Sequence, residues 1–429
     1  MRWTKVKADL ALATSAEVVQ KLAGYAVLAI LARYVDQTDM GRVFFAFTLA
    51  WVVAVVTELG TSRYLVREIA TRPESGLDRL GEVLALRVPL VAGGFILVNA
   101  AVAMVQPELA PVVLPVSAAV LAGDLYYAFA AFLIGRREVG LRLATGLSGP
   151  VVLVVLVVGM VRRGATLEEI LACYVIASLV PLGAAAVVVW RRFGPIRAAA
   201  SRAGVWHAAR GSLPFFFLTA LGIVHFKVDT LLLFGLTSPA AVAIYETGYK
   251  LFEVSRLVIR PTATVFFPVT AALAAAGDWT GFARVLRRLL LLSGAVGAGL
   301  AAVMVVGAGL VVTLAWGDRY ADTAPVLRIL YLAVPAVYVA FVATFAAGSL
   351  HLEGAAARVL AVCLAMNVGL NLLVIPRWGP IGAAWTTLVT EMLAAAWLLG
   401  LVLHALRARM AEGKPDPRPL SAAELSIDG

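Results

Sequence analysis

Residues 143–161, LATGLSGPVVLVVLVVGMV, form a continuous apolar stretch that contains no charged side chain. A helix of about 20 apolar residues crosses the hydrocarbon core of a bilayer. The apolar residues follow one another without the strict alternation of a barrel strand, and an open strand would leave its backbone groups unpaired in lipid. The stretch therefore predicts a membrane-spanning helix.

The composition of the whole chain is that of a membrane protein. Hydrophobic residues make up 62% of the chain and charged residues 14%, and the mean hydropathy is +0.92. A soluble chain would carry roughly 25% charged residues. We expect an all-α polytopic membrane protein with about twelve transmembrane helices in two six-helix halves around a central cavity. The windows that predict these helices lie at about 10–31, 40–60, 86–106, 112–134, 143–161, 169–190, 213–236, 241–272, 288–315, 324–347, 355–376 and 380–406.

A basic segment at 191–212 divides the predicted spans into two sets of six. We therefore expect an N-terminal half at 1–190, a basic cytoplasmic linker at 191–212 that can lie on the membrane surface, and a C-terminal half at 213–406. Residues 407–429 are polar and contain prolines, which predicts a disordered cytoplasmic tail. The predicted outside connections are short, which favours a carrier over an enzyme that joins glycans outside the membrane.

The formal net charge of +10 reflects membrane topology rather than nucleic-acid binding. With a cytoplasmic N-terminus, most Lys and Arg residues fall in cytoplasmic connections, as at 63–87 and 191–210. We expect a multi-pass protein of the cytoplasmic (inner) membrane, with both termini in the cytoplasm and no nucleic-acid partner. Glu17, Gln20 and Lys21 interrupt the first apolar window, so we expect no cleaved signal peptide.

The segment 245–268, YETGYKLFEVSRLVIRPTATVFFP, carries five ionisable groups near one face of a predicted helix: Glu246, Lys250, Glu253, Arg256 and Arg260. A charge in hydrocarbon costs at least about 2.5–3.5 kcal/mol, so this face must meet a wet cavity or a partner. Two interpretations stay open. The charges line a cavity, or the acids pair with Lys250 and Arg256 on a structural helix and leave Arg260 before a kink at Pro261.

Other predicted spans also carry embedded charges. Lys227 and Asp229 are two residues apart and cannot share a helix face, so Asp229 needs a cation elsewhere, for which Lys250 and Arg256 are candidates. Glu17 and Lys21 have the spacing of an ion pair, with cavity lining as the alternative. The remaining embedded acids are candidate proton or cation sites: Asp124, Glu58 and Glu391.

The sequence contains no motif that would indicate an enzyme or a metal protein. Cys173 and Cys363 both fall inside predicted spans, and the four histidines have no metal-ligand spacing, so we expect neither a metal site nor a bound cofactor. The glycines at 294–299 lie in an apolar span without a following Lys-Ser/Thr, which predicts helix packing rather than a nucleotide loop. We expect a protein that is not an enzyme.

Five passages together resemble the polysaccharide (Wzx-type) flippases of the multidrug/oligosaccharidyl-lipid/polysaccharide exporter superfamily. They are ELGTSRYLVREIATR at 58–72, VDTLLLFGLTSPAAVAIYETGYKLFEV at 228–254, FFPVTAAL at 266–273, WGDRYADTAPVLRIL at 316–330 and NVGLNLLVIPRWGPIGAAWTTLVTE at 367–391. Their order and spacing extend the resemblance over essentially the whole chain. The acidic residue that the family has in its seventh span corresponds here to Asp229, and the tyrosine at the start of its eighth span to Tyr245.

The resemblance implies translocation of a polyprenyl-diphosphate-linked oligosaccharide from the inner to the outer leaflet, by alternating access. Such a substrate needs cations, of which the chain offers Arg256, Arg260, Lys250, Lys227 and Lys21, and the arginines suit a diphosphate best. Partners would be the lipid-linked oligosaccharide, membrane lipids and a glycan polymerase or ligase. Coupling to Na⁺ or H⁺ through Asp229 or Glu246 stays open. The alternative is an ion-coupled multidrug antiporter of the same superfamily.

Overall fold

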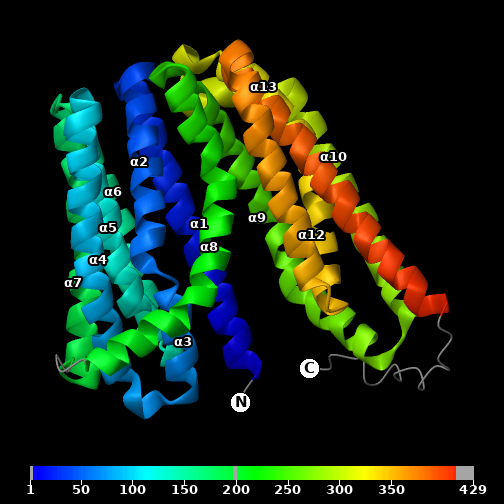
Figure 1. Ribbon diagram of the computed structural model, residues 1–429. Helices are drawn as coiled ribbons and strands as arrows, with labels where there is room; N and C mark the ends of the chain where they lie inside the picture. The colour runs from blue at the N-terminus through cyan, green and yellow to red at the C-terminus, as the bar shows by residue number, and fades with distance from the viewer. Residues whose placement is uncertain (1–2, 197–200, 412–429) are drawn as a thin grey trace. The chain divides into compact units, whose positions relative to one another are not determined.

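The computed structural model describes residues 3–196 and 201–411, without the side chains of 3–18, 218–219, 221–226 and 264. Within those residues every assigned element is a helix (Figure 1). The chain forms two compact units, Met1–Phe234 and Gly235–Gly429, and each is described by itself below.

The first unit is built around α5. Its helices are α1 Trp3–Tyr34, α2 Gln37–Glu58, α3 Thr61–Thr71, α4 Gly76–Val105, α5 Ala110–Gly135, α6 Val139–Arg162, α7 Leu167–Phe193 and most of α8 Arg202–Leu236, with 3-10 turns at Pro73–Ser75 and Pro107–Leu109. Helix α5 packs against α2, α3, α4 and α7, while α6 packs against α1 and α7. Side chains on α5 therefore face the interior of the unit on several sides.

The second unit surrounds α9 and α12. Its helices are α9 Pro239–Ala276, α10 Trp279–Trp316, α11 Thr323–Leu332, α12 Val334–Ser349 and α13 Glu353–Ala411, with a 3-10 turn at Asp318–Tyr320. Helix α12 packs against α9, α10 and α13, and α11 packs against α9, α10 and α13. Helix α9 thus has neighbours that come from the whole length of this unit.

The helices confirm the prediction of an all-α polytopic membrane protein. Eight described helices are long and apolar enough to cross a membrane, or nine if the bent α9 counts as one span. Helix α13 leaves helical geometry at Gly379 (φ 52°, ψ −132°), so it holds both predicted spans 355–376 and 380–406. The predicted spans 10–31 and 213–236 fall on α1 and α8, whose side chains are described only in part.

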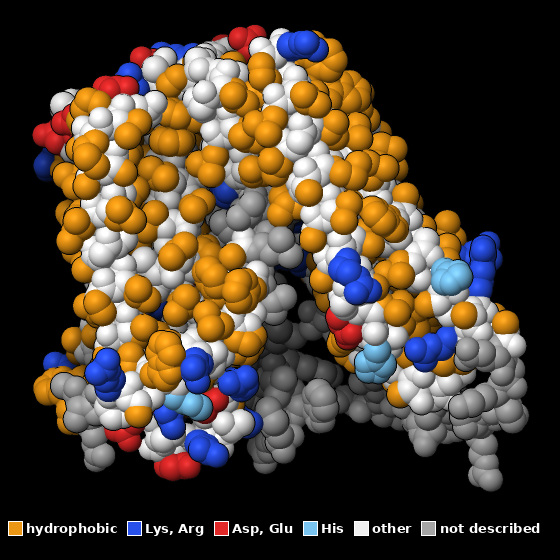
Figure 2. Space-filling view, viewed as in Figure 1, with side chains coloured by type: hydrophobic (Ala, Val, Ile, Leu, Met, Phe, Trp, Pro, Cys, Tyr) orange, Lys and Arg blue, Asp and Glu red, His pale blue; other side chains and the backbone are white. Residues whose placement is uncertain are grey.

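Hydrophobic side chains cover the middle of the helices on the face of the first unit seen in Figure 2. Charged side chains gather at the two ends of these helices in the same view. This distribution is expected for helices that cross a bilayer, because apolar side chains are stable in the hydrocarbon core and charged side chains are not.

Polar caps set the helix ends at the predicted connections. The Asp36 carboxylate accepts a hydrogen bond from the Asp39 backbone N–H (2.8 Å) at the start of α2. Thr166 and Glu169 form a capping box at the start of α7. Ser238 caps α9, and Pro239 occupies its first turn, where a missing N–H costs nothing.

Both ends of the segment predicted as a linker, 191–193 and 202–212, are helical, and residues 197–200 lie outside the described part of the chain. Helix α7 extends to Phe193, and α8 begins at Arg202 and continues past residue 213 without a break. Ala208 and Ser212 are buried within the first unit, and the two compact units meet in sequence at Phe234–Gly235. The predicted tail begins inside α13, which ends at Ala411; residues 412–429 lie outside the described part of the chain.

A glycine holds α8 against the junction of α2 and α3. Leu59 (φ 50°) and Gly60 (φ 73°) turn the chain between these helices. A Cβ at Gly60 would lie 2.5 Å from both the backbone N of Phe216 and the backbone O of Ser212. Only glycine permits this approach, because both contacts are with backbone atoms and the φ is left-handed.

We predict that Gly60→Ala lowers the free energy of unfolding by at least about 1–2 kcal/mol, since it adds left-handed strain and a backbone clash. Thermal unfolding of the purified protein in detergent measures the loss. Gly93→Ala on α4 is the matched control, because a Cβ there meets no atom within 4 Å. Equal unfolding temperatures for both variants would show that the close contact is not required.

Candidate functional site

Three of the five charges on α9 form a chain of ion pairs. Lys250 Nζ lies 2.9 Å from Glu253 Oε2 and 3.9 Å from Glu246 Oε2. The Glu246 side chain is 1% exposed, whereas those of Lys250 and Glu253 keep partial access to solvent at 16% and 28%. The predicted pairing of Glu246 with Lys250 is therefore present, and Lys250 also binds the next acid along the helix.

Arg256 connects α9 to α13. Its Nη2 lies 3.2 Å from Glu391 Oε1, and its guanidinium lies over the Phe252 ring, 5.4 Å from the ring centroid. The sequence offers Glu253 as the partner of Arg256 because it is three residues away on the same helix. Glu391 is 135 residues further along the chain, so only the fold brings it to Arg256.

Hydrogen bonds fix the helix that carries these charges. The Tyr245 hydroxyl lies 3.2 Å from Thr387 Oγ1 on α13, and Thr247 Oγ1 lies 2.9 Å from Thr323 Oγ1 on α11. Tyr331 on α11 donates to the Leu251 carbonyl oxygen (3.0 Å), and Tyr338 on α12 donates to that of Ser255. The charged groups of α9 are thus held on a rigid element, as a binding site requires.

The charges on α9 and Glu391 balance, with three cations and three carboxylates. Arg256 and Glu391 are both partly exposed, at 21% and 13%. A ligand can therefore reach this pair, and an anion that bound Arg256 in place of Glu391 would leave the Glu391 carboxylate without this cation. Arg260 is exposed one turn further along the same helix.

Helix α9 bends soon after Arg260. Pro261 lies inside the helix, and the segments Pro239–Ala263 and Val265–Ala276 meet at 42°. A second proline, Pro268, also lies inside α9, and the bend at residues 263–265 falls in the turn before it, where the ring of Pro268 displaces the carbonyl four residues earlier. The bend is thus at the turn before Pro268, and the predicted kink at Pro261 stays a prediction.

The other predicted site residues lie in the first unit. Asp229 is buried on α8, and Lys21 and Lys227 are half-buried. The side chain of Glu17 lies outside the described part of the structure. A pairing of Asp229 with Lys250 or Arg256 would join the two units and stays a prediction.

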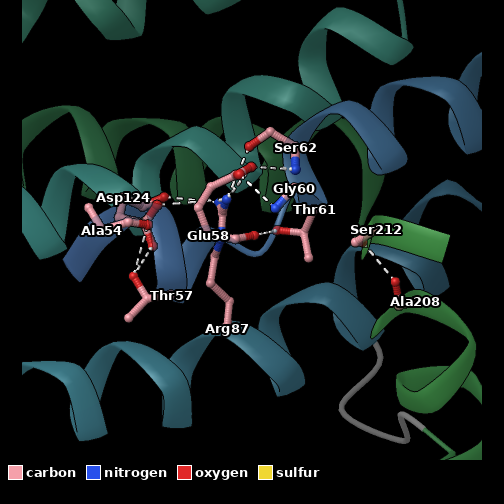
Figure 3. A network of polar contacts seen from close by, with 10 residues as sticks. All are labelled: Ala54, Thr57, Glu58, Gly60, Thr61, Ser62, Arg87, Asp124, Ala208 and Ser212. Atoms are coloured by element: carbon pink, nitrogen blue, oxygen red, sulfur yellow. Dashed lines mark hydrogen bonds and ion pairs between the residues drawn. The ribbon is translucent and has the colours of Figure 1, made fainter. Parts of the chain in front are cut away.

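A second charged cluster surrounds Arg87 in the first unit (Figure 3). The Arg87 side chain is fully buried, and its Nη2 lies 2.9 Å from Glu58 Oε1 and 3.7 Å from Asp124 Oδ1. Its Nη1 donates to the Asp124 carbonyl oxygen (3.0 Å), and Thr57 Oγ1 donates to Asp124 Oδ2 (3.2 Å). Three helices, α2, α4 and α5, therefore meet at one guanidinium.

Glu58 also holds the turn between α2 and α3. Its carboxylate accepts hydrogen bonds from the backbone N–H groups of Gly60 and Ser62, each at 2.8 Å. The sequence identifies Glu58 and Asp124 as embedded acids but places Arg87 in a cytoplasmic connection, so it misses their shared cation. The position of Arg87 in the sequence could have indicated this role. Arg87 falls inside the apolar window 86–106, where a charged side chain needs partners.

Comparisons with known proteins agree with this architecture. The family model described as "Polysaccharide biosynthesis protein" matches residues 6–274. No match was found among curated proteins.

Solved structures of three transporters share the fold. A multidrug resistance MATE family transporter of the MOP superfamily, inward-facing, has a TM-score of 0.76 at 14% identity over 92% of this chain and 96% of that one. The lipid II flippase MurJ, inward closed, has a TM-score of 0.74 at 13% identity over 93% and 90%. A MOP superfamily transporter from Pyrococcus furiosus has a TM-score of 0.62 at 14% identity over 94% of each chain.

We predict that Arg87→Leu destabilises the protein by about 3–5 kcal/mol, because it leaves the buried Asp124 and the half-buried Glu58 without their cation. Chemical unfolding of the purified protein in detergent measures this loss. Arg79→Leu on the same helix is the control: Arg79 pairs with Glu82 at 2.7 Å in a partly exposed position, where a pair contributes about 0–1 kcal/mol. Losses of equal size would contradict a special role for the buried cluster.

Proposed function

Since the chain belongs to the polysaccharide biosynthesis protein family, we propose that it is a flippase for a polyprenyl-diphosphate-linked oligosaccharide. It moves this lipid from the inner to the outer leaflet of the cytoplasmic membrane, for polysaccharide biosynthesis and export. The observation that carries the proposal is the family match over residues 6–274. The fold, which is that of MOP-superfamily transporters and flippases, supports it.

The chemistry of α9 fits the diphosphate of such a substrate. Arg256 presents a planar guanidinium that can bind two phosphate oxygens at once, and its present partner is a carboxylate of similar geometry. The diphosphate takes the place of Glu391, while Lys250 and Arg260 supply further positive charge. Lys227 and Lys21 are proposed as additional contacts. The polyprenyl chain remains in the lipid.

Transport follows an alternating-access cycle in which the two six-helix halves rock about the substrate. Both termini lie in the cytoplasm, so α9 runs from the outer side inward and Arg256 lies closer to the loading side than Glu246. Ion coupling, where it operates, uses Asp229 or Glu246, which are both buried carboxylates. A glycan polymerase or ligase receives the flipped lipid outside.

A multidrug antiporter is the competing function, because the fold is also that of a multidrug resistance MATE transporter. The two functions differ in what accumulates when the protein is missing.

We predict that a strain without this protein accumulates a lipid-linked oligosaccharide in the cytoplasmic leaflet and loses the surface glycan. Lipid extraction with mass spectrometry identifies the intermediate, and a membrane-impermeant glycan-oxidising reagent shows its leaflet. Greater drug sensitivity with normal lipid-linked glycan would favour the antiporter.

We predict that Arg256→Ala combined with Arg260→Ala abolishes export while the protein still inserts in the membrane. Loss of one charge-assisted contact costs about 1.5–3 kcal/mol, so two losses reduce transport by more than tenfold. Surface glycan and protein abundance are measured together.

Arg287→Ala combined with Arg288→Ala is the control for the charge change, because both arginines are exposed on α10. Normal surface glycan in the α9 variant would remove Arg256 and Arg260 from the mechanism.

A further inference from the structure

The first unit contains a cavity that the proposed diphosphate site does not use. It lies between α1, α5, α6 and α7 and has a volume of about 200 Å³. A single water needs roughly 10–15 Å³ measured in the same way, so the cavity has room for a much larger group. The residues around it fall in predicted spans, which places it at membrane depth.

The described lining is polar in places but carries no charge. Three tyrosines, Tyr126, Tyr127 and Tyr174, contribute aromatic faces, and Gln20 and Ser178 contribute an amide and a hydroxyl. An uncharged lining gives no counter-ion to a phosphate or to a cationic drug. Aromatic faces with a few polar groups are typical of sites for neutral ligands that are partly apolar and partly polar.

The Tyr174 hydroxyl has no hydrogen-bond partner within the described residues, although it is buried. The Tyr174 ring is held edge-on against Phe47, with 5.3 Å between ring centroids. By contrast, the Tyr126 hydroxyl donates to the Arg142 carbonyl oxygen (3.1 Å). Because this hydroxyl has no accessible surface, Tyr174 offers the cavity an aromatic face but no hydrogen bond.

Two glycines leave the cavity open. Gly24 on α1 and Gly123 on α5 both line it, and a Cβ at either position would meet no atom within 4 Å. A side chain at Gly123 would therefore enter open space without displacing a neighbour. In the middle of a helix glycine costs roughly 1 kcal/mol relative to alanine, so packing or stability does not account for it here.

We propose that this cavity binds a neutral pyranose ring of the transported glycan. A pyranose has an apolar C–H face that stacks on tyrosine rings and a rim of hydroxyls that can pair with Gln20 and Ser178. A lipid tail offers no polar group to the Gln20 amide or the Ser178 hydroxyl. This assignment rests on the proposed flippase function, and it separates recognition of the sugar from recognition of the diphosphate.

The test is saturation-transfer NMR on the full chain in phospholipid nanodiscs, with methyl β-D-glucoside, methyl β-D-galactoside and N-acetyl-D-glucosamine as probes. Wild-type protein should transfer saturation to at least one probe. Gly123→Leu, which fills the cavity, should reduce that signal by about tenfold or more. Ser178→Ala should weaken binding by about 2- to 10-fold, as loss of one hydrogen bond predicts, without lowering the unfolding temperature.

Gly93→Leu is the matched control on α4, because Gly93 is exposed and a Cβ there also meets no atom within 4 Å. It should bind the probes as wild type does. An absence of saturation transfer to all three probes in wild type, or an unchanged signal in Gly123→Leu, would overturn the cavity assignment.

Measurements of glycan export distinguish a failure of the cavity assignment from a failure of the proposed flippase function. If the strain without the protein accumulates lipid-linked oligosaccharide while Gly123→Leu exports at the wild-type rate, the cavity assignment is wrong and the flippase function stands. If that strain accumulates none, the flippase function itself is wrong.

Discussion

Hydrocarbon offers no partner to a charged side chain, and this constraint organises both units of the protein. Arg87 is buried against Glu58 and Asp124, Arg256 pairs with Glu391, and Lys250 lies between two acids of its own helix. The pairs of Arg87 and Arg256 join helices that are distant in sequence. Because a charge left alone in the membrane would cost several kcal/mol, each of these pairs specifies which helices must pack together.

The Arg87 cluster and the glycine contacts of α8 meet at the same place. Glu58 accepts hydrogen bonds from the turn that Gly60 forms, and Gly60 in turn contacts the backbone of α8. The first residues of α8 are therefore packed on the first unit rather than acting as a loose connection.

The two polar regions suit different parts of the proposed substrate. Arg256 on α9 is partly exposed and can bind a phosphate, whereas the described lining of the cavity in the first unit is uncharged and aromatic. A lipid-linked oligosaccharide has both kinds of group, an anionic diphosphate and neutral sugar rings. Separate recognition of the two would let the protein reject lipids that carry only one of them.

The sequence by itself determined the helical class, most of the span positions and the family, because these follow from local features: continuous apolar windows and motif order. It also identified Glu58, Asp124 and Glu391 as embedded acids that need partners. Only the tertiary structure decided which cations pair with these acids, because Arg87 and Arg256 are far in sequence from the carboxylates that they contact. The sequence likewise did not indicate the cavity around Tyr174, because residues from four separate helices line it and no single helix contains a motif for it.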